Sequence, residues 1–218
     1  MGEPASKPLR VVVADDHPFY RRELARSLAA NGIEVAAEAS NGEIAIRAVE
    51  RTNPDVVIMD LNMPGVSGLE ATRRLMERDP STRVLVLSVS AEEADVTDAL
   101  VAGAVGYVLK DRQVQELIEA IRAAATGEAR ISPQLAMSLL RRLRGLAGVE
   151  LDLTELQLTG EERWVLDLVS DGYADHEIAE RLGSSTSAVR AVAATILMKL
   201  RPKDRVKAAE RASRRRLA

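Results

Sequence analysis

Short apolar runs alternate with segments of helical periodicity over the first 127 residues. The apolar runs are rich in Val, Ile and Leu, which indicates strands that are buried on both faces of a parallel sheet. The predicted strands are Arg10–Ala14, Val35–Glu38, Val56–Asp60, Val84–Ser88 and Gly106–Leu109. The predicted helices are Tyr20–Ala30, Glu43–Arg51, Leu69–Arg78, Ala94–Val101 and Val114–Ala125. Five such units predict an α/β fold, a doubly wound five-stranded parallel sheet with the flavodoxin-like strand order 2-1-3-4-5.

The alternation of strands and helices stops near Gly127. A helix is predicted over Pro133–Leu143, because proline favours the first helical position, and residues 145–156 have the mixed composition of a linker. The later helices, predicted from apolar spacing and glycine turns, are Gly160–Ser170, Asp175–Leu182, Thr186–Leu200 and Lys203–Arg214. A short helix, a glycine turn and a longer helix are typical of a helix-turn-helix, although any small helical bundle has the same spacing.

Composition agrees with two domains of ordinary size in 218 residues. The expected division is a domain over 9–127, a linker with a helix over 128–157 and an all-α domain over 158–218. The hydrophobic content of 46% supports cores that must be aliphatic, because only 2% of the residues are aromatic. The absence of cysteine excludes disulfides, thiol catalysis and Cys-ligated zinc. Neither a signal peptide nor an apolar run of membrane-spanning length is visible, so we expect a cytoplasmic protein without a membrane partner.

The net charge of −3 is unevenly distributed. Residues 1–128 carry 14 Lys and Arg against 21 Asp and Glu, whereas residues 154–218 carry 12 against 10. The basic residues of the second stretch concentrate at its end and are Lys199, Arg201, Lys203, Arg205, Lys207, Arg211, Arg214, Arg215 and Arg216. Such a patch suits a polyanion such as nucleic acid, although a solvated basic tail has the same composition.

Polar residues stand at the ends of four predicted strands. Asp15 and Asp16 follow the first strand, Asp60 ends the third, Ser88 ends the fourth and Lys110 follows the fifth. The carboxyl ends of the strands of an open α/β sheet meet at one edge, where ligands bind. Any one of these residues alone would be an ordinary helix cap, turn residue or surface residue. Their coincidence at one edge predicts a functional site.

The chemistry of this site follows from its charge. Three carboxylates repel one another unless a cation joins them, and all-oxygen ligands favour a hard ion such as Mg²⁺. A carboxylate can also accept a phosphoryl group covalently, as an aspartyl-phosphate. Asp60 is the best acceptor candidate, because it ends the most apolar strand and precedes a loop able to fold around a phosphoryl group. Lys110 would add a positive charge, and Ser88 a hydrogen-bond donor, for the phosphate oxygens.

At these residues the chain resembles the receiver domain of two-component response regulators, over roughly residues 9–127. The Asp-Asp-His-Pro string at residues 15–18 resembles the NarL/FixJ family in particular. The resemblance implies that Asp60 is the phosphoacceptor and that Lys110 holds the phosphate. It also implies that Ser88 and Tyr107 form a switch pair, in which the hydroxyl moves toward the phosphate and the aromatic ring turns inward.

The same resemblance implies a Mg²⁺ site. Asp16 would bind the ion directly, and Asp15 would assist, often through water. Asp60 and the backbone carbonyl of Asn62 would be further ligands. Mg²⁺ is therefore the expected cofactor.

The last stretch resembles the LuxR-type DNA-binding domain, over about residues 158–212. The residues that carry this resemblance are the string 177–182 and the pairs Leu158-Thr159, Val165-Leu166, Ile196-Leu197, Lys199-Leu200 and Asp204-Arg205. It implies DNA contacts from Ser185, Thr186, Arg190, Ala191, Ala194, Lys199, Lys203 and Arg205. Family members usually carry Thr-Val-Lys-x-His where residues 188–192 of this chain are Ala-Val-Arg-Ala-Val. The helix thus has few donors for base edges, and backbone charge is expected to dominate DNA binding.

These features predict a phosphorylation-controlled transcription factor and not an enzyme. A sensor histidine kinase or a small phosphodonor would phosphorylate Asp60, and the changed receiver would form a homodimer whose helix-turn-helix domains bind double-stranded DNA. One alternative is a receiver-based protein-interaction module whose degenerate helix-turn-helix does not recognise DNA specifically. Another is an aspartyl-phosphate hydrolase, against which the lack of a separate substrate-pocket motif counts.

Overall fold

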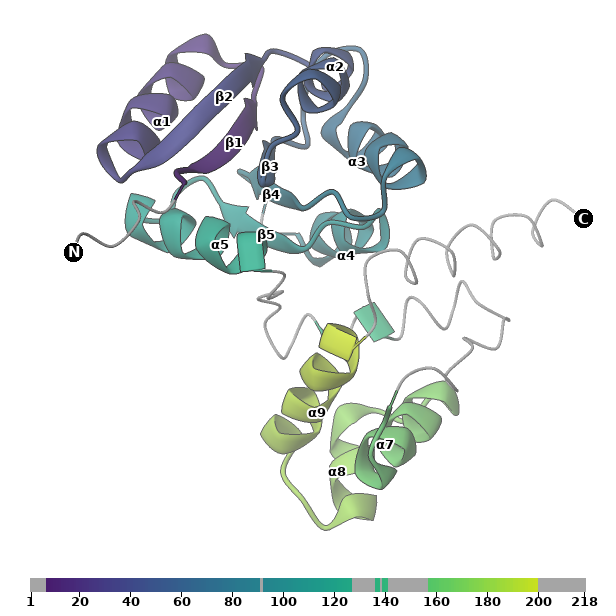
Figure 1. Cartoon of the computed structure of the whole chain (residues 1–218). Coiled ribbons are helices and arrows are strands. Elements are labelled where there is room, and N and C mark those ends of the chain that lie inside the picture. The colour runs from purple at the N-terminus through teal and green to yellow at the C-terminus, as the bar shows by residue number, and fades with distance from the viewer. Residues whose placement is uncertain (1–6, 91, 127–135, 138, 141–156, 200–218) are drawn as a thin grey trace, which may run out of the picture. The chain divides into compact units, whose positions relative to one another are not determined.

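Figure 1 shows the computed structural model of the chain, which describes residues 7–90, 92–126, 136–137, 139–140 and 157–199. The chain divides into two compact units, residues 1–90 with 104–128 and residues 91–103 with 129–218. The predicted helix Lys203–Arg214, with the predicted DNA contacts Lys203 and Arg205, lies outside the described residues. The described residues of the predicted helix Pro133–Leu143 are helical and buried, and they are Ala136, Met137, Leu139 and Leu140.

A five-stranded parallel sheet forms the centre of the first unit. Its strands are β1 (Leu9–Ala14), β2 (Ile33–Ala39), β3 (Val56–Met59), β4 (Val84–Ser88) and β5 (Gly106–Leu109). The strand order is β2-β1-β3-β4-β5, and each neighbouring pair is parallel. This order confirms the predicted doubly wound, flavodoxin-like fold.

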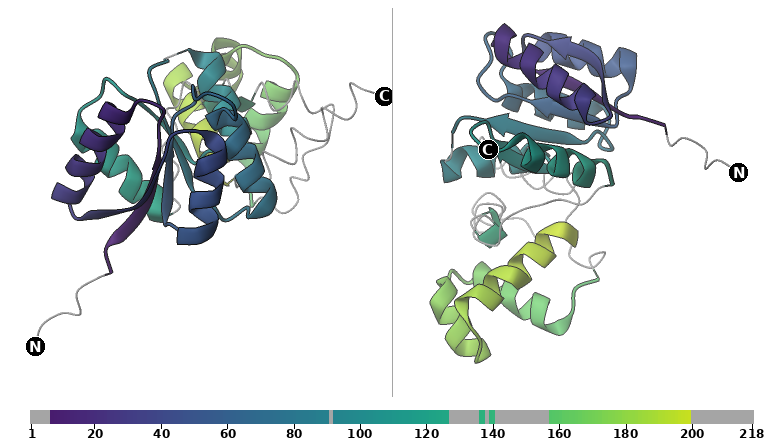
Figure 2. Two further views of the ribbon diagram at one scale, coloured as in Figure 1. Left: turned by 90° about the horizontal axis from the view of Figure 1, so that it is seen from above. Right: turned by 90° about the vertical axis from the view of Figure 1, so that its left-hand side faces the viewer.

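Helices cover both faces of this sheet. Successive side chains of a strand point to opposite faces, so the buried strands supply two separate apolar cores. One core contains side chains of α1 (Pro18–Ala30) and α5 (Val114–Thr126), and the other contains side chains of α2 (Gly42–Thr52) and α3 (Gly68–Arg78). Figure 2 shows the two pairs of helices on opposite sides of the sheet. This double covering leaves only the strand ends and loops to form a site.

Two predicted element starts differ from the structure by two residues, and several other predicted boundaries differ by one, such as the end of β3 at Met59 instead of Asp60. β2 begins at Ile33, ahead of the predicted start at Val35, because the buried Ile33 belongs to the apolar core although the charged Glu34 interrupts the pattern. α1 begins at Pro18 instead of Tyr20. Proline lacks a backbone N–H, but the first turn of a helix has no intrahelical partner for that group, so Pro18 fits there.

The second unit contains α4 (Glu93–Val101), α7 (Gly160–Ser170), α8 (Asp175–Leu182) and α9 (Thr186–Lys199). A capping box between Thr159 and Glu162 opens α7, and α8 ends at a glycine with φ of 59° that turns the chain toward α9. α9 packs against both α7 and α8. This arrangement confirms the predicted helix-turn-helix. Within the described residues, none of the helices combines the length and the apolar character that crossing a membrane requires.

Candidate functional site

Three charged side chains meet beyond the carboxyl ends of β1, β3 and β5. These side chains belong to Asp15, Asp60 and Lys110, and their exposed fractions are only 2%, 4% and 10%. Nζ of Lys110 lies 2.7 Å from Oδ2 of Asp15 and 3.0 Å from Oδ2 of Asp60. The parallel strand order thus brings together residues that are far apart in the sequence.

Asp16 and His17 extend this cluster toward solvent. The side chain of Asp16 is 29% exposed, and its Oδ1 lies 2.7 Å from Nδ1 of His17. One ligand atom from each of Asp15, Asp16, His17 and Asp60 lies within 4.8 Å of the others. His17 is not among the predicted ligands, because an exposed histidine at the start of a helix carries no chemical signal of its own in the sequence.

The carboxylate oxygens of the cluster fit a hard divalent cation. Oδ2 of Asp15 and Oδ1 of Asp16 are buried. Nζ of Lys110 and Nδ1 of His17 lie 2.7 Å from them, but within the described part of the chain neither oxygen has a partner with the geometry of a hydrogen bond. Buried polar atoms normally have a hydrogen-bond partner. Mg²⁺ binds through one or two carboxylates and keeps several waters, so these two oxygens suit the predicted cofactor.

Burial dominates the electrostatics of the acceptor candidate. Burial raises the pKa of Asp60, and the charge of Asp15 adds to this effect, while Lys110 and the backbone N–H of Asn62 oppose it. Burial lowers the pKa of Lys110, but the carboxylates of Asp15 and Asp60 outweigh burial, so its pKa is raised. The ammonium therefore stays charged, and the ionised form of Asp60 depends on positive charge beside it.

Two residues of α1 support the cluster and were not predicted. Nζ of Lys110 lies 5.0 Å from the centre of the Tyr20 ring, a distance at which a cation is attracted to an aromatic face. Nη1 of Arg21 donates a 2.5 Å hydrogen bond to the backbone carbonyl of Asp15, and its Nε donates to Glu38. Both positions match an ordinary amphipathic helix, so the sequence pattern alone could not identify them.

The loop after β3 folds back against the backbone of Asp60. The N–H of Gly68 donates a 3.0 Å hydrogen bond to the carbonyl of Leu61. A Cβ atom at Gly68 would lie only 1.8 Å from the carbonyl oxygen of Asp60, so a larger residue would force the loop to move. Asn62 lies in this loop, next to the acceptor. Its backbone carbonyl remains a predicted metal ligand.

Ser90 links the two residues of the predicted switch pair. Ser88 is fully buried at the end of β4, and its Oγ accepts a 3.2 Å hydrogen bond from the N–H of Ser90. The hydroxyl of Tyr107, on the neighbouring strand β5, donates a 2.7 Å hydrogen bond to the carbonyl of Ser90. A shift of this short loop would therefore affect both side chains.

Most of the predicted DNA-contacting residues lie at the start and along one side of α9. Oγ of Ser185 accepts a 3.2 Å hydrogen bond from the N–H of Ala188 and so caps the helix. The partly or fully exposed members on the helix itself are Thr186, Arg190, Ala191 and Ala194. These side chains are available to a ligand of the second unit.

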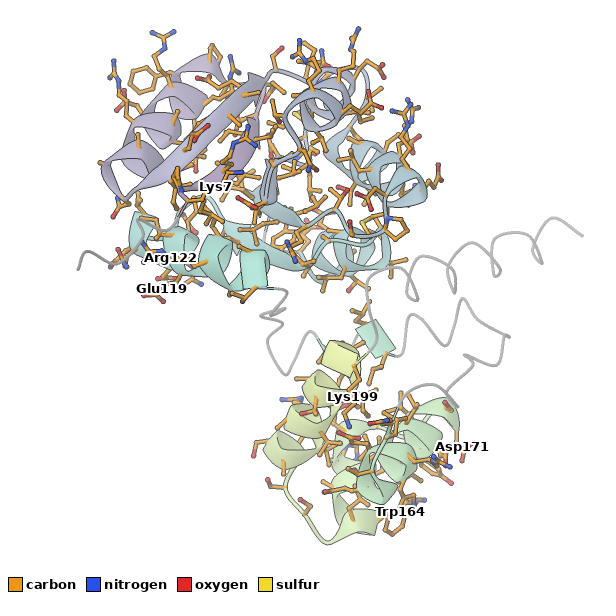
Figure 3. The ribbon with its side chains drawn as sticks, in the orientation of Figure 1. Lys7, Glu119, Arg122, Trp164, Asp171 and Lys199 are labelled. Atoms are coloured by element: carbon orange, nitrogen blue, oxygen red, sulfur yellow. The ribbon has the colours of Figure 1, made fainter. Side chains whose placement is uncertain are left out.

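Lys199, labelled in Figure 3, was predicted to contact DNA, but its side chain has partners within the protein. Its Nζ lies 2.6 Å from Oε2 of Glu162 and donates a 2.9 Å hydrogen bond to the carbonyl of Gln157. Glu162 is buried, and burial raises its pKa, but Lys199 and Thr159 outweigh burial and lower it overall. The ion pair ties the end of α9 to α7, so its geometry does not support a phosphate contact by Lys199.

Comparison with known proteins assigns two domains, and the first of them includes α4, which the compact units place in the second. Residues 11–122 match the response regulator receiver domain, and residues 156–212 match the bacterial regulatory proteins of the luxR family. The chain is 39% identical to the transcriptional regulatory protein DegU of Brevibacillus brevis, over 92% of this chain and 91% of DegU. It is 40% identical to the nitrate/nitrite response regulator protein NarL of Escherichia coli K12, over 93% of this chain and 94% of NarL. The chain belongs to the NarL/FixJ family of two-component response regulators.

A solved structure supports this assignment. A two-component response regulator of the LuxR family from Aurantimonas sp. SI85-9A1 is 36% identical, with a TM-score of 0.57, over 62% of this chain and 98% of that chain. The two matched domains make this response regulator a phosphorylation-controlled regulator of transcription. The family assignment confirms the predicted function, and it does not favour the protein-interaction alternative.

Proposed function

We propose that this response regulator accepts a phosphoryl group on the carboxylate of Asp60. The observation that supports this role is Nζ of Lys110, held 2.7 Å from Asp15 and 3.0 Å from Asp60, where it can neutralise an incoming phosphate. An oxygen of Asp60 attacks phosphorus and forms an O–P bond. At the same time, the bond from phosphorus to the imidazole nitrogen of a sensor histidine kinase, or to the carboxylate oxygen of a small acyl phosphate, breaks. The leaving imidazole or carboxylate keeps the electron pair of that bond.

Asp15, Asp16, Asp60 and the backbone carbonyl of Asn62 would hold Mg²⁺ at this site. When bound, the ion supplies positive charge for the phosphate oxygens. The buried oxygens of Asp15 and Asp16 that accept no hydrogen bond support this ligand set within the described residues. The ammonium of Lys110, now paired with Asp15 and Asp60, would then pair with the transferred phosphoryl group.

Ser88 and Tyr107 would carry the change away from the site. The Ser88 hydroxyl accepts a 3.2 Å hydrogen bond from the N–H of Ser90. Movement of this hydroxyl toward the phosphoryl group would therefore shift Ser90. The carbonyl of Ser90 holds the hydroxyl of Tyr107 at 2.7 Å, so a shifted Ser90 releases the ring to turn inward. The charge of the phosphoryl group thus selects between two arrangements of the loop at Ser90 and of the Tyr107 ring.

The proposed domain division is a receiver over residues 9–127, a linker with a helix over 128–157 and a helix-turn-helix domain over 158–218. A sensor histidine kinase would be the upstream partner, and the response regulator would act in the cytoplasm. The phosphorylated receiver would form a homodimer, and the paired helix-turn-helix domains would bind double-stranded DNA.

Asp16→Ala should lower the affinity for Mg²⁺ by about 10-fold or more, since losing a ligand costs at least as much as losing a residue that orients one. Isothermal titration calorimetry is the appropriate measurement, because it requires no fluorescent side chain at the site. Asp111→Ala is a matched control, because its side chain is 81% exposed beside Lys110. Equal affinity in the wild type and in Asp16→Ala would refute the ligand assignment.

Addition of Mg²⁺ and beryllofluoride should convert the full chain from monomer to dimer. A single small helix-turn-helix domain buries little DNA-facing surface, and a dimer doubles it. Sedimentation velocity measures the change. Asp60→Asn should remain monomeric under the same conditions, and a wild-type protein that also stays monomeric would contradict the proposed dimerisation.

Lys203→Gln and Arg205→Gln should weaken binding to all DNA sequences alike, because these predicted phosphate contacts act through charge. Each phosphate contact that is lost should reduce the slope of log affinity against log salt by about 0.9. Fluorescence anisotropy over a salt series measures this slope. If the beryllofluoride-treated wild type had no affinity for DNA even at low salt, the protein-interaction alternative would replace DNA binding.

A further inference from the structure

Arg190 is the only charged residue in α9 before Lys199, and it is tied to a neighbouring helix. Its Nε donates a 2.7 Å hydrogen bond to Oδ2 of Asp175, the first residue of α8. The side chain of Asp175 is 12% exposed, whereas that of Arg190 is 36% exposed. The acid is thus largely buried, and the guanidinium extends from it toward solvent.

The contact leaves the outer edge of the guanidinium available. Arginine has five N–H donors in a planar fork, and only Nε of Arg190 has a hydrogen-bond partner among the described residues. The two terminal nitrogens keep their four N–H groups. Two parallel donors of this kind match O6 and N7 of guanine in the major groove.

Asp175 is itself held in place by its position in the fold. It stands in the first turn of α8, where a carboxylate is stabilised by the helix dipole. The preceding N–H, of Ala174, donates a 2.7 Å hydrogen bond to Glu177, which fixes the start of the helix. An arginine held by a fixed partner loses less side-chain freedom when it binds a base.

We propose that Asp175 is a positioning residue for base recognition, which holds the guanidinium of Arg190 in the orientation that binds a guanine. The inference rests on the proposed binding of DNA by the helix-turn-helix domain, in which the second helix of the motif, here α9, enters the major groove. The carboxylate also offsets the charge that Arg190 presents to phosphates. Asp175 therefore lowers the affinity for DNA of any sequence and raises the preference for guanine at one position.

The neighbours of Arg190 concentrate this discrimination on one side chain. Ser187, Ala188 and Ala191 are exposed beside it on α9 and have no long donor. A preference for guanine at one position of each half-site is therefore the expected contribution of Arg190. A bidentate contact discriminates by roughly 5- to 150-fold.

Selection from a randomised duplex library, with the full chain in Mg²⁺ and beryllofluoride, tests the inference. The wild type should enrich one guanine per half-site. Asp175→Ala should reduce that preference to about 2-fold or less, while its affinity for unrelated DNA at low salt rises because a negative charge is lost. Arg190→Ala should lose the same guanine, and the double variant should lose no further preference, because the two residues act as one unit.

Two variants separate positioning from folding. Asp171→Ala removes an equal charge from an exposed residue of the same unit, labelled in Figure 3, and should keep the guanine preference. Asp175→Asn keeps an oxygen that can accept from Nε and should keep part of the preference, even if Asp175→Ala does not fold.

The possible outcomes distinguish this inference from the function on which it rests. A guanine preference that is unchanged in Asp175→Ala, or fully lost in Asp175→Asn while that variant stays folded, overturns the role of Asp175. A wild type that binds DNA without a guanine preference also overturns it. A wild type that binds no DNA at all overturns the proposed function itself.

Discussion

Asp60→Asn is expected to take up no phosphoryl group from acetyl phosphate, whereas the wild type gains one. The amide lacks the anionic oxygen that attacks phosphorus. Intact-protein mass spectrometry in the presence of Mg²⁺ measures the added phosphoryl group.

The same substitution should make the first unit more stable at neutral pH. Because the folded-state pKa of Asp60 is raised, its contribution to stability is complete below the pKa of the unfolded chain and is lost as pH rises through the folded-state pKa. Ionised Asp60 is therefore unfavourable at neutral pH, and asparagine, which never ionises, avoids this cost. Urea unfolding followed by circular dichroism should show a higher midpoint for Asp60→Asn, and the difference should shrink in acid.

Asp111→Asn is the control for both measurements, since its side chain is 81% exposed and lies outside the cluster. It should accept a phosphoryl group normally and unfold at the wild-type midpoint. Phosphoryl uptake that survives in Asp60→Asn would place the acceptor elsewhere and remove the basis of the proposed mechanism.

The sequence was sufficient for the fold of the first unit because its strands are buried on both faces. Such strands are continuous apolar runs, and the residues that follow them must meet at one edge of a parallel sheet. That reasoning is enough to group Asp15, Asp60 and Lys110. The structure places Nζ of the lysine 2.7 Å from Asp15 and 3.0 Å from Asp60. It needs no knowledge of how the side chains pack.

What the sequence could not provide is the set of contacts between elements. The close approach of Gly68 to the backbone of Asp60 depends on how the loop after β3 returns, and no local pattern encodes it. Tyr20 meets Lys110, which follows it by 90 residues, only through the packing of α1 in the folded chain. Asp175 and Arg190 stand 15 residues apart on different helices, and their pairing depends on the angle of the turn between them.

The contact of Lys199 with Glu162 is likewise a contact between elements that the sequence pattern does not encode. Lys199→Met should destabilise the second unit by about 1–3 kcal/mol. Methionine keeps most of the side-chain length but leaves the buried carboxylate of Glu162 without its cation. Urea unfolding followed by the fluorescence of Trp164, which lies on α7 close to Glu162 in sequence, measures the change. Because Lys199 and Thr159 hold the pKa of Glu162 below its ordinary value, this stabilisation is present above the pKa of the unfolded chain and is lost in acid. The variant should therefore differ from the wild type at neutral pH and approach it as the pH falls.

A second substitution identifies the ion pair as the cause. Adding Glu162→Gln to Lys199→Met should recover part of the lost stability, because an unpaired charge inside the protein costs more than the absence of the pair. Lys203→Met is the matched lysine control, and it should weaken DNA binding and leave the urea midpoint unchanged. If Lys199→Met instead kept the wild-type midpoint and weakened DNA binding as Lys203→Met does, Lys199 would be a phosphate contact, as its place in the basic stretch of the sequence predicts, and the ion pair with Glu162 would contribute nothing measurable to stability.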